Sequence, residues 1–226
     1  MIDNIGDLII YKNNQLIAFA KPPLLGVQPD KTDDKSLLDL AEIYCKSKLQ
    51  LIHRLDRPAS GVVLFAKNKK ALAKLNAQFQ ERTVDKTYLA VVKEKPAELK
   101  GTLVHYLMKD ARKHKAIAHT EEVKGAQRAE LSYEILASSE RYHLLKIKLI
   151  TGRFHQIRAQ LAAINCPIKG DVKYGFRRGN KDRSIHLHAF SLSFKHPVTK
   201  EKVTLQTPPP QEVIWDAFAA DLPKEK

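Results

Sequence analysis

Apolar runs and alternating patterns along the chain predict several β-strands. Residues 15–21 form a short apolar run that ends at two prolines, and residues 62–67 form a second run; both are typical of buried strands. Residues 86–92 are β-branched and aromatic, which also favours a strand. Residues 129–137 and 141–150 complete the set. In the last of these, leucine and isoleucine alternate with lysine, as one buried and one solvent-facing side require.

Other segments have the spacing of amphipathic helices. Residues 36–48 place apolar side chains on one stripe, with Ser36 as a suitable N-cap. Asn68 is suited to cap a second helix that turns Leu72, Leu75 and Phe79 inward and its lysines outward. A third helix is predicted from His155 to Ile164, followed by helix-ending residues, and a last one over 211–222. Strands and helices together predict an α+β protein.

The balance of charge is the unusual feature of the composition. Among 226 residues, 43% are hydrophobic and 28% are charged, which is ordinary for a globular protein, and we expect one domain (1–226) of two halves. The formal net charge, however, is +14. Such an excess favours a polyanionic partner, because each neutralised phosphate releases bound counterions. A basic soluble protein without such a partner is the alternative.

Several other classes of protein are disfavoured. No apolar run is long enough to span a bilayer, and the first residues lack the features of a signal peptide, so we expect a cytoplasmic protein with no membrane partner. Cys45 and Cys166 form neither a disulfide framework nor a metal-binding pair. His186 and His188 lie two residues apart, but no acidic or cysteine cluster accompanies them. We therefore expect no metal.

Two basic segments are candidates for contact with a polyanion. Residues 100–128 are rich in turns and in Lys and Arg, and predict a hairpin or extended arm; a solvated insertion without a partner is the alternative. Residues 170–183 form a polar loop that contains Gly170, Lys173, Arg177 and Arg178 and carries few acidic residues. This loop suits contact with a phosphate backbone.

The stretch 53–61, His-Arg-Leu-Asp-Arg-Pro-Ala-Ser-Gly, is the strongest candidate for chemistry. Pro58 fixes its own φ and keeps Arg57 out of a helix, and Gly61 permits a backbone geometry that a side chain resists. Asp56 should therefore lie on a sharply turned loop between two arginines. Guanidinium neighbours favour an ionised carboxylate, which suits a nucleophile. A surface turn with a solvated Arg–Asp pair is the alternative.

A second candidate stretch is 151–158, Thr-Gly-Arg-Phe-His-Gln-Ile-Arg. Gly152 allows a tight turn, so Arg153 should lie between a strand and a helix, beside exposed N–H groups that can bind an anion. An arginine that caps the helix and points to water is the alternative.

These strings resemble three motifs of the RluA-type family of RNA pseudouridine synthases. The stretch 53–61 resembles the family signature, with Ala59 where Thr is usual, and residues 86–90 resemble the second motif, Lys-x-Tyr-x-Ala. The stretch 151–158 resembles the third, with Phe154 where Thr or Ser is commoner. Further likeness at Lys21-Pro22, 167–175 and 187–189 extends the resemblance from about Lys21 to about Pro208.

The resemblance implies a fold and a set of site residues. The fold is a mixed, mostly antiparallel bent sheet with flanking helices and a central cleft, here without the N-terminal S4-like RNA-binding domain that family members often carry. Asp56 is implied as the catalytic aspartate, Tyr88 as the residue against the target base, and Arg153 as the partner that holds Asp56. Arg54 is implied to fill the space of the extruded nucleotide. The remaining expected RNA contacts are His155, Gln156, Arg158, Lys173, Arg177 and Arg178.

The chemistry expected from these motifs is an isomerisation of uridine in ribosomal or transfer RNA. Glycosidases usually need two carboxylates, whereas uracil leaves as a stabilised anion and is recaptured in place, so one carboxylate suffices. Asp56 can either attack C1′ or stabilise the sugar while a C2′ proton leaves; both routes stay open. We expect no cofactor, because no phosphate-binding glycine loop is present, and a monomer. A non-catalytic RNA-binding protein and a hydrolase or lyase acting on a nucleoside or sugar are the alternatives.

Overall fold

The chain divides into two compact units. A computed structural model describes residues 4–30 and 34–223. Unit 1 comprises Met1–Asp85 with Ala189–Pro210, and unit 2 comprises Lys86–His188 with Gln211–Lys226. The chain therefore enters unit 2 at Lys86 and returns to unit 1 at Ala189. None of the described helices is long and apolar enough to cross a membrane.

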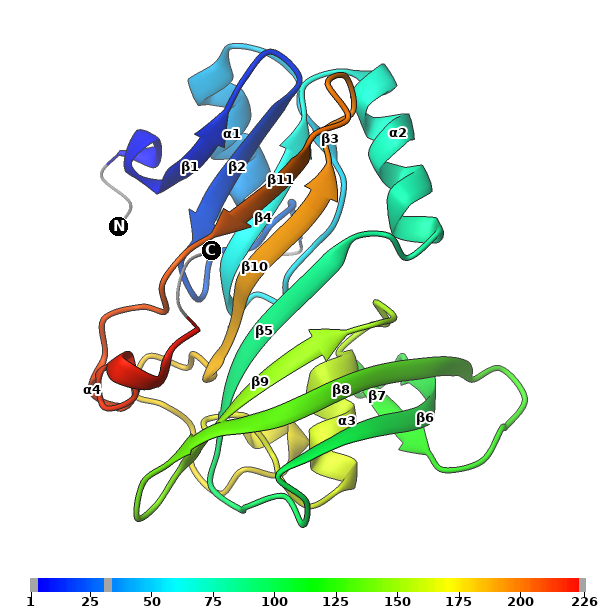
Figure 1. Ribbon diagram of the computed structural model, residues 1–226, viewed down its shortest axis with the longest axis vertical. Coiled ribbons are helices and arrows are strands. Elements are labelled where there is room, and N and C mark those ends of the chain that lie inside the picture. Colours follow the sequence, from blue (N-terminus) through cyan, green and yellow to red (C-terminus); the bar gives the residue numbers. More distant parts are fainter. Residues whose placement is uncertain (1–3, 31–33, 224–226) are drawn as a thin grey trace. The chain divides into compact units, whose positions relative to one another are not determined.

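Unit 1 is built on a sheet in which β1, β2, β4 and β10 are neighbours in that order, with β11 paired to β10 and a short β3 paired to β4 (Figure 1). The β1–β2, β2–β4, β3–β4 and β10–β11 pairs are antiparallel. A 3-10 turn, η1 (Ile5–Leu8), precedes the first strand. The strands are β1 (Ile9–Lys12), β2 (Leu16–Lys21), β3 (Gln50–Leu51), β4 (Ser60–Ala66), β10 (Leu187–Lys195) and β11 (Lys202–Gln206).

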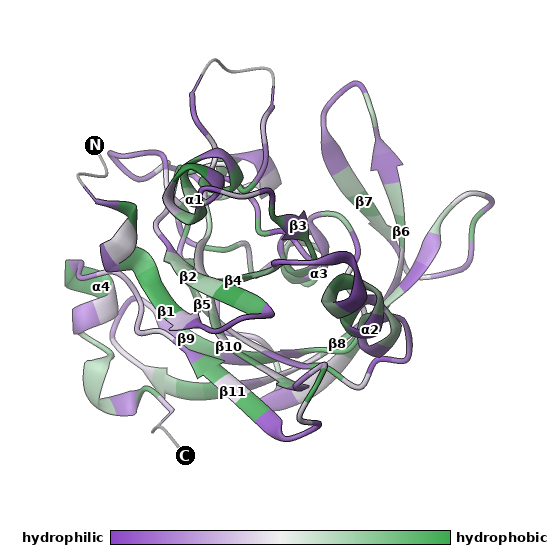
Figure 2. Cartoon of the chain, turned by 90° about the horizontal axis from the view of Figure 1, so that it is seen from above, coloured by the Kyte–Doolittle hydropathy of each residue, from purple (hydrophilic) through white to green (hydrophobic). Residues whose placement is uncertain are grey.

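The core of unit 1 lies between this sheet and the helix α2 (Lys69–Gln80). Every residue of β4 is buried, and Val62 and Leu64 pack against Leu75 of α2. The hydrophobic colouring of β1 and β4 and the mixed colouring of α2 reflect this arrangement (Figure 2). Asn68 accepts a hydrogen bond from the third residue of α2, which confirms the predicted cap.

The second helix of unit 1, α1 (Leu37–Cys45), is also capped as predicted. Ser36 accepts from the backbone N–H of Asp39, whose carboxylate accepts in return from the N–H of Ser36. The helix ends at Cys45, three residues earlier than the pattern predicts, and its C-cap Lys46 adopts the left-handed conformation.

Unit 2 contains an antiparallel sheet with the order β5-β9-β8-β6-β7. The helix α3 (Gln156–Ala163) packs on β6, β7 and β8, and Ala159 joins Leu107, Ala116 and Ala129 in a small core. The strands are β5 (Asp85–Val92), β6 (Lys100–Asp110), β7 (Lys115–His119), β8 (Gln127–Ser138) and β9 (His143–Leu149).

Most predicted elements are confirmed, including the hairpin within 100–128, which is β6–β7. The α+β class and the mostly antiparallel sheet are confirmed as well. The predicted helix over 211–222 is wrong in extent: it is a short α4 (Val213–Asp216) followed by a 3-10 turn, η3 (Ala219–Asp221). Trp215 and Phe218 are both buried, and the backbone leaves the helical conformation at Phe218.

Candidate active site

Asp56 lies on the loop between β3 and β4, at the start of a tight turn. The N–H of Ala59 donates to the carbonyl oxygen of Asp56 at 3.0 Å, and Pro58 lies within the turn, as the sequence predicts. The Asp56 side chain is partly buried, whereas Arg54 is exposed. The loop therefore presents a carboxylate on a constrained backbone.

Gly61 lies where this loop enters β4, directly against the backbone of β10. Its φ is +121°, a conformation that L side chains rarely adopt. A Cβ at this position would lie 2.5 Å from the backbone nitrogen of Ala189, and closer still to its carbonyl oxygen. Close approach of the two strands thus excludes any side chain at Gly61, in addition to the turn geometry that the sequence predicts.

Arg57 fastens the other side of the loop. Its guanidinium forms ion pairs with Asp30 at 3.1 Å and with Asp34 at 2.5 Å. Its Nε donates to the carbonyl oxygen of Leu24 at 2.9 Å. The hydrogen bond with Asp34 is the largest of the effects that raise the pKa of Arg57. The residue after Asp56 therefore ties the loop to the segment that follows β2.

Lys21, part of the Lys21-Pro22 pair that resembles the family sequence, is a buried cation that holds the loop. It is 1% exposed. Its Nζ donates to the carbonyl oxygens of Pro22 and Leu25 at 2.9 Å each, and to that of Arg57 at 3.2 Å. Burial lowers the pKa of Lys21 to about 7, the charge of Asp56 raises it, and that of Arg57 lowers it. Asp56 therefore interacts electrostatically with an ammonium group that is inaccessible to solvent.

His53, the first residue of the signature, has a structural role. Its Nε2 accepts from the backbone N–H of Leu64 at 3.1 Å, and its ring stacks on Phe79 of α2 at 5.6 Å. The start of the loop is thus anchored to β4 and α2.

In unit 2, Tyr88 lies in β5, opposite Ile147 of β9, and its side chain is partly buried. Arg153 lies in the turn between β9 and α3, also partly buried, and its Nε donates to the carbonyl oxygen of Arg128 at 3.2 Å. The predicted strand-to-helix position of Arg153 is confirmed.

Gln156 organises this turn from within. Its side-chain oxygen accepts from the Thr151 hydroxyl at 2.8 Å and from the Arg153 N–H at 2.9 Å. Its NH2 group donates to the carbonyl oxygen of Glu130 and to the side chain of Gln160. All four hydrogen-bonding positions of the amide are therefore occupied, and the side chain is buried. Gln156 therefore holds the Arg153 turn from the interior, and its contact with RNA stays a prediction.

Arg158 is likewise structural. Its Nε and Nη2 form a two-pronged ion pair with Asp171 at 2.6 and 2.8 Å, and both side chains are at least 95% buried. The guanidinium also lies 4.9 Å from the ring centre of Tyr174. Arg158 faces the interior because its partners come from the segment after α3, and its contact with RNA stays a prediction.

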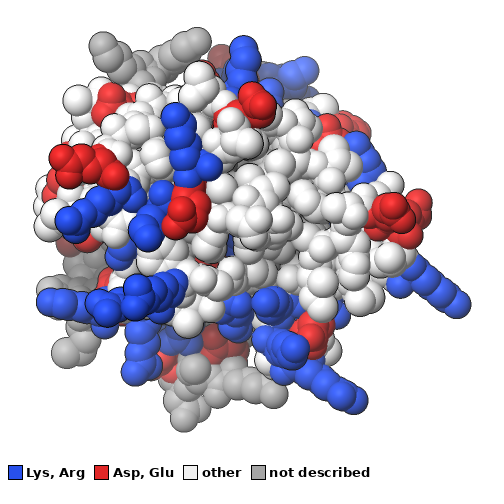
Figure 3. Space-filling model, turned by 90° about the horizontal axis from the view of Figure 1, so that it is seen from below, with Lys and Arg blue, Asp and Glu red and all other residues white. Residues whose placement is uncertain are grey.

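The other predicted RNA-binding residues of unit 2 are accessible. Lys173, Arg177 and Arg178 are exposed, and His155 is partly buried. Lys173 donates to the carbonyl oxygen of His114 in the β6–β7 turn at 3.3 Å. On the face shown in Figure 3, Lys and Arg project around a band of uncharged residues.

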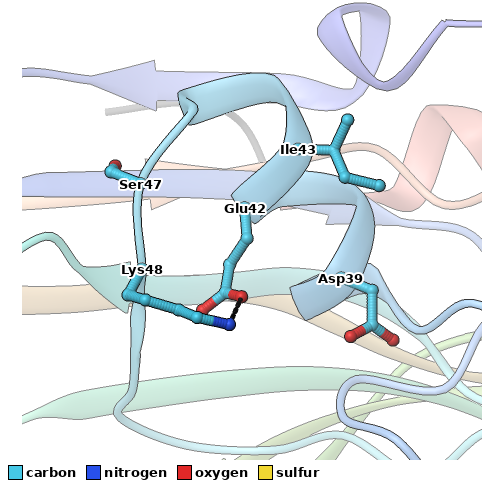
Figure 4. A pocket seen from close by; sticks show the side chains of 5 residues that line it. All are labelled: Asp39, Glu42, Ile43, Ser47 and Lys48. Carbon is cyan, nitrogen blue, oxygen red and sulfur yellow. Dashed lines mark hydrogen bonds and ion pairs between the residues drawn. The ribbon is translucent and has the colours of Figure 1, made fainter.

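A surface hollow on unit 1 lies beside α1 (Figure 4). Glu42 accepts there from Lys48 at 2.7 Å and from the N–H of Leu49 at 3.0 Å, and Asp39 belongs to the capping box. Both carboxylates are therefore used to stabilise the helix and its connection. The lining residues are Asp39, Glu42, Ile43, Ser47 and Lys48, none of which is a predicted site residue.

The histidines considered for a metal have other partners. His186 interacts with Glu212 at 2.9 Å and stacks on Trp215, and the ring of His188 meets Trp215 edge-on. Within residues 4–30 and 34–223, no group of three His, Cys, Asp or Glu side chains is arranged to hold a metal ion.

Cys166 is buried, and burial raises the pKa of its thiol, which disfavours the reactive thiolate.

The sequence matches the family model for RNA pseudouridylate synthase over residues 15–163. The chain belongs to this family. The resemblance drawn from the three motifs is thereby confirmed, and family membership makes this chain an isomerase that converts uridine in RNA to pseudouridine.

Related pseudouridine synthases cover most of the chain. A tRNA pseudouridine synthase C from Haemophilus ducreyi is 34% identical over 87% of this chain and 88% of its own length. A ribosomal large subunit pseudouridine synthase C from Rickettsia prowazekii is 31% identical over 88% of this chain and 67% of its own. The solved structure of human RNA pseudouridylate synthase domain containing 1 matches with a TM-score of 0.76 at 26% identity, over 92% of this chain and 86% of that one.

Proposed function

We propose that this pseudouridine synthase isomerises uridines of transfer or ribosomal RNA, with Asp56 as its catalytic carboxylate. The observation that carries the proposal is the attachment of the Asp56 loop through Lys21, Arg57 and Gly61. A loop held so firmly keeps its carboxylate in one position, and fixed positioning of the reacting group lowers the barrier. The relatives named for transfer RNA and ribosomal RNA support the two substrate classes.

The reaction breaks the bond between C1′ and N1, turns the uracil within the site and joins C1′ to C5. In one route, a carboxylate oxygen of Asp56 attacks C1′ and uracil leaves with the bonding electron pair. C5 then attacks C1′, the ester bond breaks, the C5 proton is lost and N1 gains a proton. In the other route, the carboxylate stabilises the sugar while a base takes a C2′ proton, uracil leaves with the C1′–N1 electron pair, and the C2′–H electron pair forms a C1′–C2′ double bond. C5 then adds to C1′ as C2′ regains its proton, the C5 proton is lost and N1 gains a proton. Both routes require Asp56 to be ionised, and neither requires a second carboxylate.

Three further residues have proposed roles on the same nucleotide. Tyr88 stacks on the uracil and can accept the C2′ proton, Arg153 orients Asp56, and the exposed Arg54 fills the space that the extruded uridine leaves. Extrusion costs a few kcal/mol in a duplex and less in a single-stranded loop. We therefore propose that the target uridine lies in an unpaired or weakly paired segment.

Release of tritium from RNA labelled at uracil C5 tests the proposal. Transfer RNA and large-subunit ribosomal RNA transcripts should lose tritium without freeing uracil, and replacement of Asp56 by asparagine should abolish the release. Free uracil would instead indicate a hydrolase. Undiminished release by the Asp56→Asn protein would overturn the assignment of Asp56, and no release from any cellular RNA would leave a non-catalytic RNA-binding protein. Mapping pseudouridines in cells that lack the protein identifies the RNA.

A further inference from the structure

Phe154 is an aromatic residue presented at the surface of unit 2. It follows Arg153 in the turn between β9 and α3, and 37% of it is exposed. Its ring stacks on the neighbouring His155 ring, with 3.8 Å between ring centres and 19° between planes. In the family motif that this stretch resembles, Thr or Ser is commoner at this position.

Contacts from the protein interior hold the His155 ring, on which Phe154 stacks. Tyr174 is buried, and its hydroxyl accepts from the backbone N–H of Ala116 at 2.7 Å and pairs with His155 Nδ1 at 3.0 Å. The Tyr174 ring also meets the His155 ring edge-on at 5.7 Å. His155 adopts φ +51°, a left-handed conformation that is strained for a residue with a side chain. These contacts fix the His155 ring, and thereby the inner face of Phe154, despite that strain.

The outer face of Phe154 already attracts a cation. Lys109 Nζ lies 5.1 Å from the centre of the Phe154 ring. Because His155 covers one face of the ring at van der Waals distance, the ammonium group lies over the other. Lys109 is an exposed side chain near the end of β6, and it can leave the ring by rotation about its own bonds. The cation over the outer face is therefore a flexible, solvated group.

We propose that this outer face is a stacking subsite for one unpaired RNA base that flanks the target uridine. The inference rests on the proposed function, because the neighbouring Arg153 is assigned to that uridine. A base that stacks on an aromatic side chain gains about 5- to 150-fold in affinity, whereas an exposed cation–π contact contributes about 2- to 5-fold. A base therefore displaces Lys109 from the ring, and the released ammonium group binds the adjoining phosphate.

Binding of a fluorescein-labelled oligouridine of about 12 nucleotides tests the subsite. Phe154→Thr introduces a residue that the related motif uses, and should weaken binding at least 5-fold, while Phe154→Trp should bind at least as tightly as the wild type. Because stacking releases no counterions, Phe154→Thr should leave the slope of log K against log salt unchanged. Lys109→Gln should reduce that slope by about 0.7. Leu99→Thr, which alters another exposed apolar side chain of unit 2, is the matched control and should bind as the wild type.

Binding by Phe154→Thr within twofold of the wild type, with a melting curve like that of the wild type, would overturn the subsite. So would a failure of the wild-type chain to bind the oligouridine. The tritium-release assay separates this inference from the proposed function. If release is normal while Phe154→Thr binds normally, only the subsite is wrong. If Phe154→Thr weakens binding but no RNA loses tritium, Phe154 still stacks on a base, but the proposed function and the place of that base beside a target uridine are both wrong.

Discussion

The Lys21 ammonium group donates a 3.2 Å hydrogen bond to the carbonyl oxygen of Arg57, the residue that follows Asp56. This bond joins the last residue of β2 to the loop that carries the proposed catalytic carboxylate. A buried cation is costly unless it is hydrogen-bonded, and here three carbonyl oxygens satisfy its three donors. Lys21 therefore stabilises the shape of the loop without being exposed to a substrate.

The buried position of Lys21 predicts a characteristic dependence of stability on pH. Its pKa is about 7 in the folded chain and 10.5 in the unfolded chain, so between these values the unfolded chain holds more protons. The free energy of unfolding should thus rise with pH across this window, by up to about 1.4 kcal/mol per pH unit. This gain disappears as pH falls toward 7. Urea unfolding at pH 7, 8 and 9 measures the rise.

Lys21→Met removes the titrating group, so the rise between pH 7 and 9 should be smaller in this variant than in the wild type. Lys70→Met, which replaces an exposed lysine of α2, should retain it. Equal pH profiles for the wild type and Lys21→Met would show that the ammonium group is not buried as described.

The contact of Gly61 with β10 predicts that this position tolerates no side chain. Gly61→Ala places a methyl group against the backbone of Ala189 and should cost about 3 kcal/mol or more of unfolding free energy. Gly125 is a matched control, because its φ of +87° is also left-handed but no atom lies within 4 Å of a built Cβ. Gly125→Ala should therefore cost only about 1 kcal/mol. Similar denaturation midpoints for the two variants would contradict the close approach.

The periodicity of the sequence predicts the parts of this fold that depend on local patterns. Ser36 and Asn68 cap helices as expected, because an N-cap acts within one turn of its own position. The buried strand β4 follows from its continuous apolar run. By contrast, β1 and β11 are four and five residues long and only partly buried, so neither stands out by pattern.

The side chains whose burial the sequence does not predict are those whose partners are distant along the chain. Arg158 is predicted to contact RNA, and its pairing with Asp171 and contact with Tyr174 form only in the folded chain. Lys21 ends an apolar strand, and only folding brings the Arg57 carbonyl to it. Local pattern gives no signal of this burial in α3, where the polar residues Gln156 and Arg158 flank Ile157 and all three are buried.

Burial of His186 predicts a loss of stability in mild acid. Burial is the main cause that lowers its pKa below 6.5, and the charge of Glu212 opposes the shift. As pH falls below 6.5 the unfolded chain takes up a proton that the folded chain resists, so the free energy of unfolding should decrease, by at most about 1 kcal/mol between pH 6.5 and 5.5. His186→Gln should lose less over this interval by thermal or urea unfolding. His114→Asn, at an exposed turn, should lose as much as the wild type.

Substitutions at Arg158 and Arg177 should distinguish a loss of stability from a loss of RNA binding. Arg158→Gln leaves Asp171 buried without its partner and should cost about 3 kcal/mol or more of unfolding free energy. At a temperature where the variant is folded, the salt dependence of its oligouridine binding should equal that of the wild type, because a buried guanidinium contacts no phosphate.

Arg177→Gln should have the opposite effects. Its stability should lie within about 0.5 kcal/mol of the wild type, and its salt slope should be lower by about 0.7 because the exposed loop contacts the RNA backbone. Arg128→Gln breaks an ion pair that is accessible to solvent and gives the reference for a surface interaction, about 1 kcal/mol or less. A salt slope reduced by Arg158→Gln would restore Arg158 to the RNA interface and contradict the structural role that its pairing with Asp171 indicates.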